Sequence, residues 1–393
     1  MLRFPSKTNQ VTLEDFLNEL RSDQQAPLRL PIKLDMGGAF GIASLAAQIV
    51  STWAQTRTDG VKLSLNKAYA ENVATQDRFA STLPGMTALY FADSISCDQL
   101  NLSRFQALSS VAPYVEAMQK EDYANTLRGV GAALCCFAGA RNEFLKPLYA
   151  VPAPNGVNSE SVFRILIPRM LESLNSGKPF AINEGQLDYL SAMVYQLFLN
   201  ADQHGAYELD GNRYRKGVRG VTARLNSFSD LPSIVASAGD DTHLRSYLTR
   251  AASNVSSPAP SAKKSVLSHS SVQILEISVF DTGPGLALRW LADKNGATGY
   301  SDFTLEEELE AVQTCFQKHT STKAGNLFGQ GLPVALRALQ KLKAFMTIRT
   351  GRLSLYQDFS HSKTSDFTPH QRFQGKELGE MAGATYTIWF RVK

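Results

Sequence analysis

The stretch Phe280-Asp281-Thr282-Gly283-Pro284-Gly285 decides how this sequence is interpreted. Residues 274–280 alternate apolar and polar side chains, which predicts a strand, so Asp281 would stand at its end and begin a glycine-containing turn. A carboxylate there can accept a hydrogen bond from the amino group of adenine, and the glycines let the chain turn sharply beneath the base. An ordinary turn contains the same residue types, so this stretch needs support from elsewhere in the chain.

A predicted helix over residues 184–204 carries the next candidate residues. Gln196, Asn200 and His204 are spaced four residues apart and would form one row along this helix. The amide oxygen of Asn200 is a suitable ligand for Mg²⁺, which prefers oxygen and keeps water molecules while it bridges phosphates. Taken alone, Asn200 would more simply hydrogen-bond a neighbouring loop.

Glycines also precede a third predicted helix. Residues 318–325 read KHTSTKAG, and Gly329-Gln330-Gly331-Leu332 follows them. Free N–H groups at a helix start form an anion site together with the helix dipole, and Lys323 would reach terminal phosphates as a point charge. We therefore expect residues 286–328 to form a lid over a nucleotide. The alternative is a flexible loop with solvated lysines.

In this order, the segments resemble the GHKL ATPase superfamily, named for DNA gyrase, the heat-shock chaperone, histidine kinases and MutL. Residues 197–204 (LFLNADQH) resemble its Asn box, 281–285 and 321–332 its two glycine boxes, and 383–387 (GATYT) its last Gly-Thr strand. The resemblance implies a Bergerat-type two-layer α/β sandwich, a helix layer on a mixed sheet, that binds ATP and Mg²⁺. It implies Asn200 as the metal ligand and the following nucleotide-binding residues: Asn200, Asp281, Gly283, Gly285, Thr322, Lys323, Gly329, Gly331, Leu332 and Thr385.

Two features depart from the family pattern. Hydrolysing members carry a Glu four residues before the Asn to activate water, and this chain has Gln196 there. A Gln side chain orients water but is no general base, so hydrolysis is expected to be slow or to use another residue, with His204 and Asp202 as candidates. All six histidines lie in the ATPase-like part, which argues against autophosphorylation in cis.

The sequence therefore predicts a Mg²⁺-dependent ATP-binding protein that acts as an ATPase conformational switch, in signalling or in a multi-component system such as bacterial defence. Closure of the lid would change contacts with the N-terminal part, a protein partner or a second copy in a homodimer. Two alternatives stay open. One is a trans-acting, anti-sigma-type kinase that phosphorylates Ser or Thr of a partner. The other is a sensor that binds ATP or ADP without hydrolysing it.

The chain divides into two predicted domains at the stretch Val151-Pro152-Ala153-Pro154-Asn155-Gly156. Residues 1–150 are predicted to form a small α/β domain of unknown role, and residues 155–393 the ATP-binding domain. The strand, glycine turn and helix expected over residues 30–56 faintly resemble a STAS-type module, which motivates the kinase alternative. Residues 251–271, rich in Ser, Ala and Pro, are expected to be a surface insertion.

Further elements are predicted from local patterns. In the first domain we expect helices at 12–20, 42–56, 111–118 and 123–137, and strands at 30–35, 61–65 and 88–91. In the second domain we expect helices at 159–174, 304–317 and 333–342, a hairpin over 345–356 and a closing strand at 385–392. Thr304 and Glu307 form a predicted capping box.

Composition bounds the class of protein. The chain has 393 residues, of which 44% are hydrophobic and 19% charged, as expected for a globular protein with room for two cores. Its 40 Lys and Arg against 36 Asp and Glu give no argument for nucleic acid, and the basic run 213–224 is expected to be a solvated face or an interdomain contact. The sequence has no GxxxxGK[ST] motif, no ~20-residue apolar span and no signal peptide, and its four cysteines lack ligand spacing. We expect a cytoplasmic protein with reduced thiols.

Overall fold

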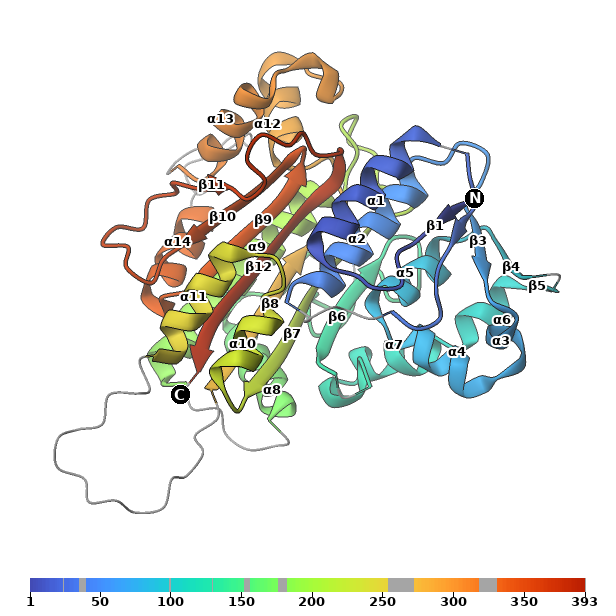
Figure 1. Ribbon diagram of the computed structural model, residues 1–393, viewed down its shortest axis with the longest axis horizontal. Helices are drawn as coiled ribbons and strands as arrows, with labels where there is room; N and C mark the ends of the chain where they lie inside the picture. The colour runs from blue at the N-terminus through green and yellow to red at the C-terminus, as the bar shows by residue number, and fades with distance from the viewer. Residues whose placement is uncertain are drawn as a thin grey trace.

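The computed structural model confirms the mixed α/β class, and the residues that it describes form two sheets (Figure 1). It describes residues 1–23, 25–34, 40–98, 100–128, 130–151, 156–175, 182–253, 272–317 and 331–392. Most of the expected surface insertion at 251–271 therefore lies outside the described residues, as do residues 318–330. The five-stranded sheet has the order β1-β2-β3-β4-β5, and the seven-stranded sheet has the order β11-β10-β9-β12-β8-β7-β6.

The seven-stranded sheet forms the centre of the molecule (Figure 1). Every strand pairing in it is antiparallel among the described residues, so it is not the mixed sheet that the resemblance implied. The hairpin predicted at Gly351 is confirmed, because β9 and β10 pair antiparallel and Gly351 at their junction has a φ of 52°. The strands are β6 (Ala132–Phe137), β7 (Val218–Phe228), β8 (Val272–Phe280), β9 (Phe345–Gly351), β10 (Leu353–Asp358), β11 (His370–Gln371) and β12 (Met381–Val392).

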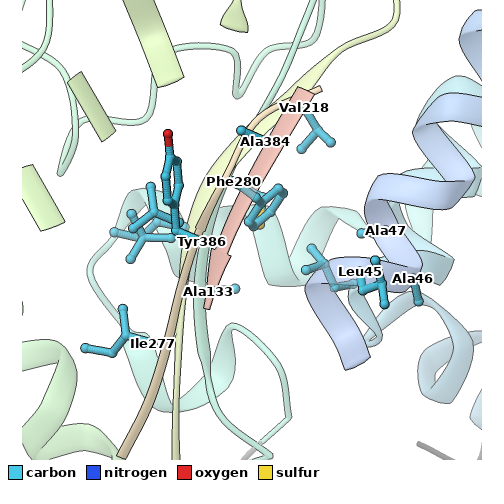
Figure 2. Close-up of a cluster of buried hydrophobic side chains, with 14 of the residues drawn as sticks. Leu45, Ala46, Ala47, Ala133, Val218, Ile277, Phe280, Ala384 and Tyr386 are labelled. Atoms are coloured by element: carbon cyan, nitrogen blue, oxygen red, sulfur yellow. The ribbon is translucent and has the colours of Figure 1, made fainter. Parts of the chain in front are cut away.

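Both faces of this sheet are covered by helices. Figure 2 shows Ile277 and Tyr386 on one side of the strands and Leu45, Ala46 and Ala47 of α2 on the other. Because side chains alternate along each strand, each strand contributes to both layers. One face packs against α8 (Glu160–Leu174), α9 (Glu184–Gly205) and α14 (Gly331–Leu342), and the other against α2 (Ile42–Gln55), α10 (Leu231–Ser237) and α11 (Thr242–Ser253). The predicted two-layer sandwich is thus extended by a third layer.

Local signals explain why the site-bearing helix forms where it does. α9 begins after Asn183, whose side chain accepts from the Gln186 N–H at 2.9 Å, in a capping box. Apolar side chains at helical spacing bury its sheet-facing stripe, which confirms the helix predicted over 184–204. The capping box of Thr304 and Glu307 likewise starts α13 (Leu305–Cys315). Between the glycine loop and α13 lie α12 (Leu286–Asn295) and the short 3₁₀ turn η2 (Tyr300–Asp302).

The N-terminal part contains the smaller sheet. Its first four strands are parallel, and β5 joins antiparallel. The strands are β1 (Leu2–Arg3), β2 (Leu28–Arg29), β3 (Lys62–Leu65), β4 (Ser94–Cys97) and β5 (Leu100–Leu102). The helices besides α2 are α1 (Gln10–Ser22), α3 (Lys67–Glu71), α4 (Val73–Ala80), α5 (Leu83–Phe91), α6 (Arg104–Ser109) and α7 (Ala112–Gln119). Among the described residues, no helix is long and apolar enough to cross a membrane.

Three local predictions for the N-terminal part are wrong. The helix expected over 123–137 is instead the 3₁₀ turn η1 (Tyr123–Asn125) followed by β6, because a short, fully buried apolar run suits a strand as well as a helix. The strand expected over 88–91 is the end of α5, which Thr82 caps and Pro84 begins. The strand expected over 30–35 is the two-residue β2, which ends at Arg29.

The N-terminal 150 residues are joined closely to the large sheet. β6 pairs with β7 along its full length, so the large sheet takes an edge strand from before residue 150. Glu14 of α1 forms a buried, two-pronged ion pair with Arg349 of β9, with distances of 2.8 and 2.9 Å. One cluster of buried side chains contains residues of both parts.

Candidate functional site

Asp281 occupies the position predicted for it. It follows β8, on the face of the sheet that packs against α9, and is only 4% exposed. The Gly283 N–H donates to its Oδ1 at 2.9 Å, and its own N–H donates to the Ala384 carbonyl at 3.0 Å. Burial raises the pKa of Asp281 to about 7, although the Gly283 hydrogen bond and the charge of Arg289 act in the opposite direction.

The last residue of α9 touches this carboxylate. A Cβ atom added to Gly205 would lie 2.3 Å from Asp281 Cγ, and one added to Gly283 would lie 2.5 Å from Gly205 Cα. Two glycines therefore permit the end of the helix and the start of the loop to meet. Sequence reasoning missed Gly205, because a glycine at a helix end is ordinarily explained as a terminator.

Tyr386 of β12 lies near both Asn200 and Asp281, and its hydroxyl has no hydrogen-bond partner among the described residues. Its side chain is fully buried and points to the α9 side of the strands (Figure 2). Burial raises the pKa of the Tyr386 hydroxyl well above its usual value, the Asp281 charge raises it further, and the neighbouring Asn200 amide lowers it. Asn200, half-buried on α9, therefore lies near the same tyrosine as the aspartate. Sequence reasoning did not identify Tyr386.

Gln196 meets the end of the second glycine segment. A Cβ atom added to Gly331, the first residue of α14, would lie 2.7 Å from Gln196 Oε1. Leu332 follows and is buried at 7% exposure. The row on α9 is therefore bounded by a glycine segment at each end. The predicted residues Thr322, Lys323 and Gly329 lie outside the described part of the chain.

The glycine loop after Asp281 is held in place by hydrogen bonds. Tyr300 Oη donates to the Pro284 carbonyl at 2.7 Å, and the Leu286 N–H donates to Thr350 Oγ1 at 3.1 Å. Gly285 has a φ of 89°, and a Cβ atom there would lie 2.6 Å from Tyr300 Oη. A side chain at this position would therefore be both strained and crowded.

Thr385 does not join Asp281. It lines a small cavity on the opposite face with residues such as Glu14, Leu45 and Thr387. Since its neighbours Ala384 and Tyr386 are packed in the core and Tyr386 points toward α9, the alternation of β12 turns Thr385 away. This position does not support the assignment of Thr385 to the nucleotide, which stays a prediction.

The candidate bases on α9 have other contacts. Asp202 forms an ion pair with Arg219 Nε at 2.9 Å and accepts from Tyr149 Oη at 2.6 Å, so its suggested role as general base is not supported. Arg219, from the basic run, is buried at 3% exposure and donates to Tyr149 Oη of the N-terminal part at 2.6 Å, which agrees with the expected interdomain contact and not with a solvated face. His204 is half-buried, and its carbonyl accepts from Arg289 at 3.3 Å. Its catalytic role stays a prediction.

The residues present fit a magnesium ion only in combination with phosphate and water. Among the described residues, no group of three or more His, Cys, Asp or Glu side chains could hold a metal. Mg²⁺ commonly keeps several water molecules and takes few protein ligands when phosphates complete its shell. A single amide oxygen from Asn200, close to a carboxylate and a phenol, is compatible with that arrangement.

A scan against protein-family models finds no family that matches this chain, and searches of curated proteins and of solved structures find no match either. The functional interpretation therefore depends on the contacts within the chain itself.

Proposed function

We propose that the protein binds ATP with Mg²⁺ between α9, the end of β8 and the start of α14, and that it works as a conformational switch of the GHKL type. The supporting observation is that α9 meets both glycine segments. Gly205 contacts Asp281 at one end of the row, and Gln196 contacts Gly331 at the other. The two glycine segments are far apart in the sequence, yet both lie against α9, as the motif resemblance implies.

Each residue has a distinct role in this proposal. The Asp281 carboxylate accepts the adenine amino group, and its burial makes that hydrogen bond selective because water competes poorly there. Asn200 supplies an oxygen ligand for Mg²⁺, which would neutralise phosphate charge. The free N–H groups at the start of α14 favour an anion. α12 follows the glycine loop directly, which supports a switch that moves this helix when nucleotide binds.

A sensor that binds ATP without hydrolysing it is the second candidate function. Gln196 supports it, because this residue occupies the position at which a general base is expected and its amide cannot accept a proton from water. Asp202, the carboxylate suggested as an alternative base, forms an ion pair with Arg219.

Calorimetric titration with ATP and Mg²⁺ tests the proposal. Asp281→Asn removes the charge while preserving the shape, and we expect it to weaken ATP binding at least tenfold. Asp59→Asn, the same substitution at an exposed position before β3, is the matched control and should leave ATP affinity unchanged. Equal affinity of wild type and Asp281→Asn would refute the adenine assignment. Labelled ATP then distinguishes the candidate functions. Release of labelled phosphate indicates an ATPase switch, and transfer of the label to a protein indicates a kinase. Binding without either indicates a sensor.

A further inference from the structure

α2 is a buried helix with a polar stripe facing the large sheet. Ser44, Gln48, Thr52 and Gln55 are three or four residues apart, so they lie along one side of the helix. Buried polar side chains are retained where they find partners, and these partners identify what α2 holds.

The first turns of α2 contact the middle of the sheet. The Gly41 N–H donates to Glu276 Oε2 at 2.8 Å, and Ser44 Oγ donates to Ser278 Oγ at 3.1 Å. Ser278 in turn hydrogen-bonds Thr387 at 3.0 Å. These bonds fix the height and rotation of the helix over β8 and β12.

The middle of α2 holds an irregularity in β12. The register of β12 against β9 shifts between Met381 and Ala384. There Gln48 Nε2 donates to the Ala382 carbonyl at 2.9 Å, and the Ala382 N–H donates to Thr52 Oγ1 at 3.0 Å. The next residue, Gly383, has a φ of 73°, and a Cβ atom on it would lie 2.1 Å from the Asp281 carbonyl oxygen. The irregularity held by α2 therefore lies against the Asp281 backbone.

The last residue of α2 contacts the glycine loop itself. Gln55 Nε2 donates to the Thr282 carbonyl at 2.7 Å and to the Lys216 carbonyl at 2.8 Å. Thr282 also uses its hydroxyl to accept from the Val218 N–H at 2.8 Å. One side chain from the N-terminal part thus holds the peptide next to Asp281 and joins it to the segment that enters β7.

We infer that Gln55 is a positioning residue for adenine recognition, and that α2 couples the N-terminal part of the chain to the Asp281 loop. This inference rests on the proposed ATP-binding function. A displacement of α2 lengthens the Gln55 hydrogen bonds and moves the Thr282 peptide. Nucleotide that fixes Asp281 must, by linkage, favour the α2 position that keeps these bonds.

Gln55→Met tests the inference, because methionine keeps the length of the side chain but donates no hydrogen bond. We expect ATP to bind about tenfold more weakly, since a loop that is no longer held presents Asp281 poorly. Inorganic tripolyphosphate, which has no base for Asp281 to recognise, is expected to bind equally to both proteins. Gln76→Met, the same substitution on half-exposed α4, is the matched control and leaves both affinities unchanged.

Hydrogen exchange supplies a readout that a purely structural role would not give. In Gln55→Met, we expect faster amide exchange at 283 and 285–286 without a general increase over the sheet, and in the wild type ATP should slow exchange in α2. Equal ATP affinity of Gln55→Met and wild type overturns the inference while leaving the proposed function intact. If Gln55→Met binds ATP and tripolyphosphate more weakly by the same factor, Gln55 only stabilises the fold, and the inference is also overturned. A wild type that binds no ATP overturns both proposals.

Discussion

Gly205 and Asp281 are in direct contact. A Cβ atom added to Gly205 would lie only 2.3 Å from the Asp281 side chain, so no other residue type fits there without a shift. This contact fixes the distance between α9 and the loop after β8. The separation of the amide row from the carboxylate therefore depends on the absence of one methyl group.

We expect Gly205→Ala to lower the free energy of unfolding by about 1–3 kcal/mol, because overpacking forces the helix end and the loop apart. ATP binding should be lost with it, as measured by urea unfolding and by titration. Gly185→Ala in the first turn of the same helix is the control. There a Cβ atom meets only Asn183 Oδ1 at 3.5 Å, so the protein should be unchanged or more stable by up to about 1 kcal/mol. Equal stability of Gly205→Ala and wild type would contradict the contact.

The buried carboxyl of Glu276 should make stability depend on pH. Burial raises the pKa of Glu276 from 4.5 to about 7, so the folded state holds the proton more tightly than the unfolded chain. The free energy of unfolding therefore falls as pH rises from about 4.5 to about 7. In Glu276→Gln, the decrease in the free energy of unfolding between these two pH values should be smaller by about 1–3 kcal/mol. Urea unfolding at about pH 4.5 and about pH 7 measures this difference.

The exposed Glu310→Gln serves as its control and should leave the pH dependence unchanged. The pKa of Asp281 is also raised, so the free energy of unfolding of Glu276→Gln should still fall somewhat as pH rises. A pH profile identical to that of the wild type would show that Glu276 is not the group responsible.

Gln196→Glu should increase ATP turnover on the order of tenfold or more, because it introduces a general base at the position next to Gly331. Phosphate release at saturating ATP measures it. Gln203→Glu makes the same chemical change elsewhere on α9 and is expected to have no effect. If Gln196→Glu binds ATP without faster turnover, water activation is organised elsewhere.

Asp202→Ala should destabilise the protein by about 3 kcal/mol, because it leaves the Arg219 guanidinium buried without its carboxylate. Chemical denaturation gives the value. In the exposed pair Arg21–Glu380, whose side chains are 43% and 39% exposed, Glu380→Ala should cost less than about 1 kcal/mol. If the two variants lose similar amounts of stability, the buried Asp202–Arg219 pair contributes no more than an exposed one.

Patterns with a short range predicted much of the site. Helical spacing placed Gln196, Asn200 and His204 on α9, and strand alternation placed Asp281 at the end of β8. The capping box at Thr304 and the turn at Gly351 were also predicted, since their signals lie within a few residues.

The missed features depend on contacts between distant segments. The face occupied by Thr385 follows from the register of β12, which the sequence does not state. Six apolar residues in β6 gave no period by which to choose between strand and helix. Tyr386 and Gly205 gain their importance only from neighbours in other elements, and the polar stripe of α2 resembles an ordinary buried helix until the sheet is placed beside it.

The partnership between α2 and β12 has a consequence for how the polypeptide matures on the ribosome. Thr52 and Ala382 are separated by 330 residues, so α2 emerges long before the strand that bonds Gln48 and Thr52 has been translated. Until then, the polar stripe is hydrated and the apolar face of the helix lacks the sheet against which it packs. Nascent chains of this protein would accordingly spend much of their synthesis with an incomplete interior, a period during which chaperone capture competes with misassociation.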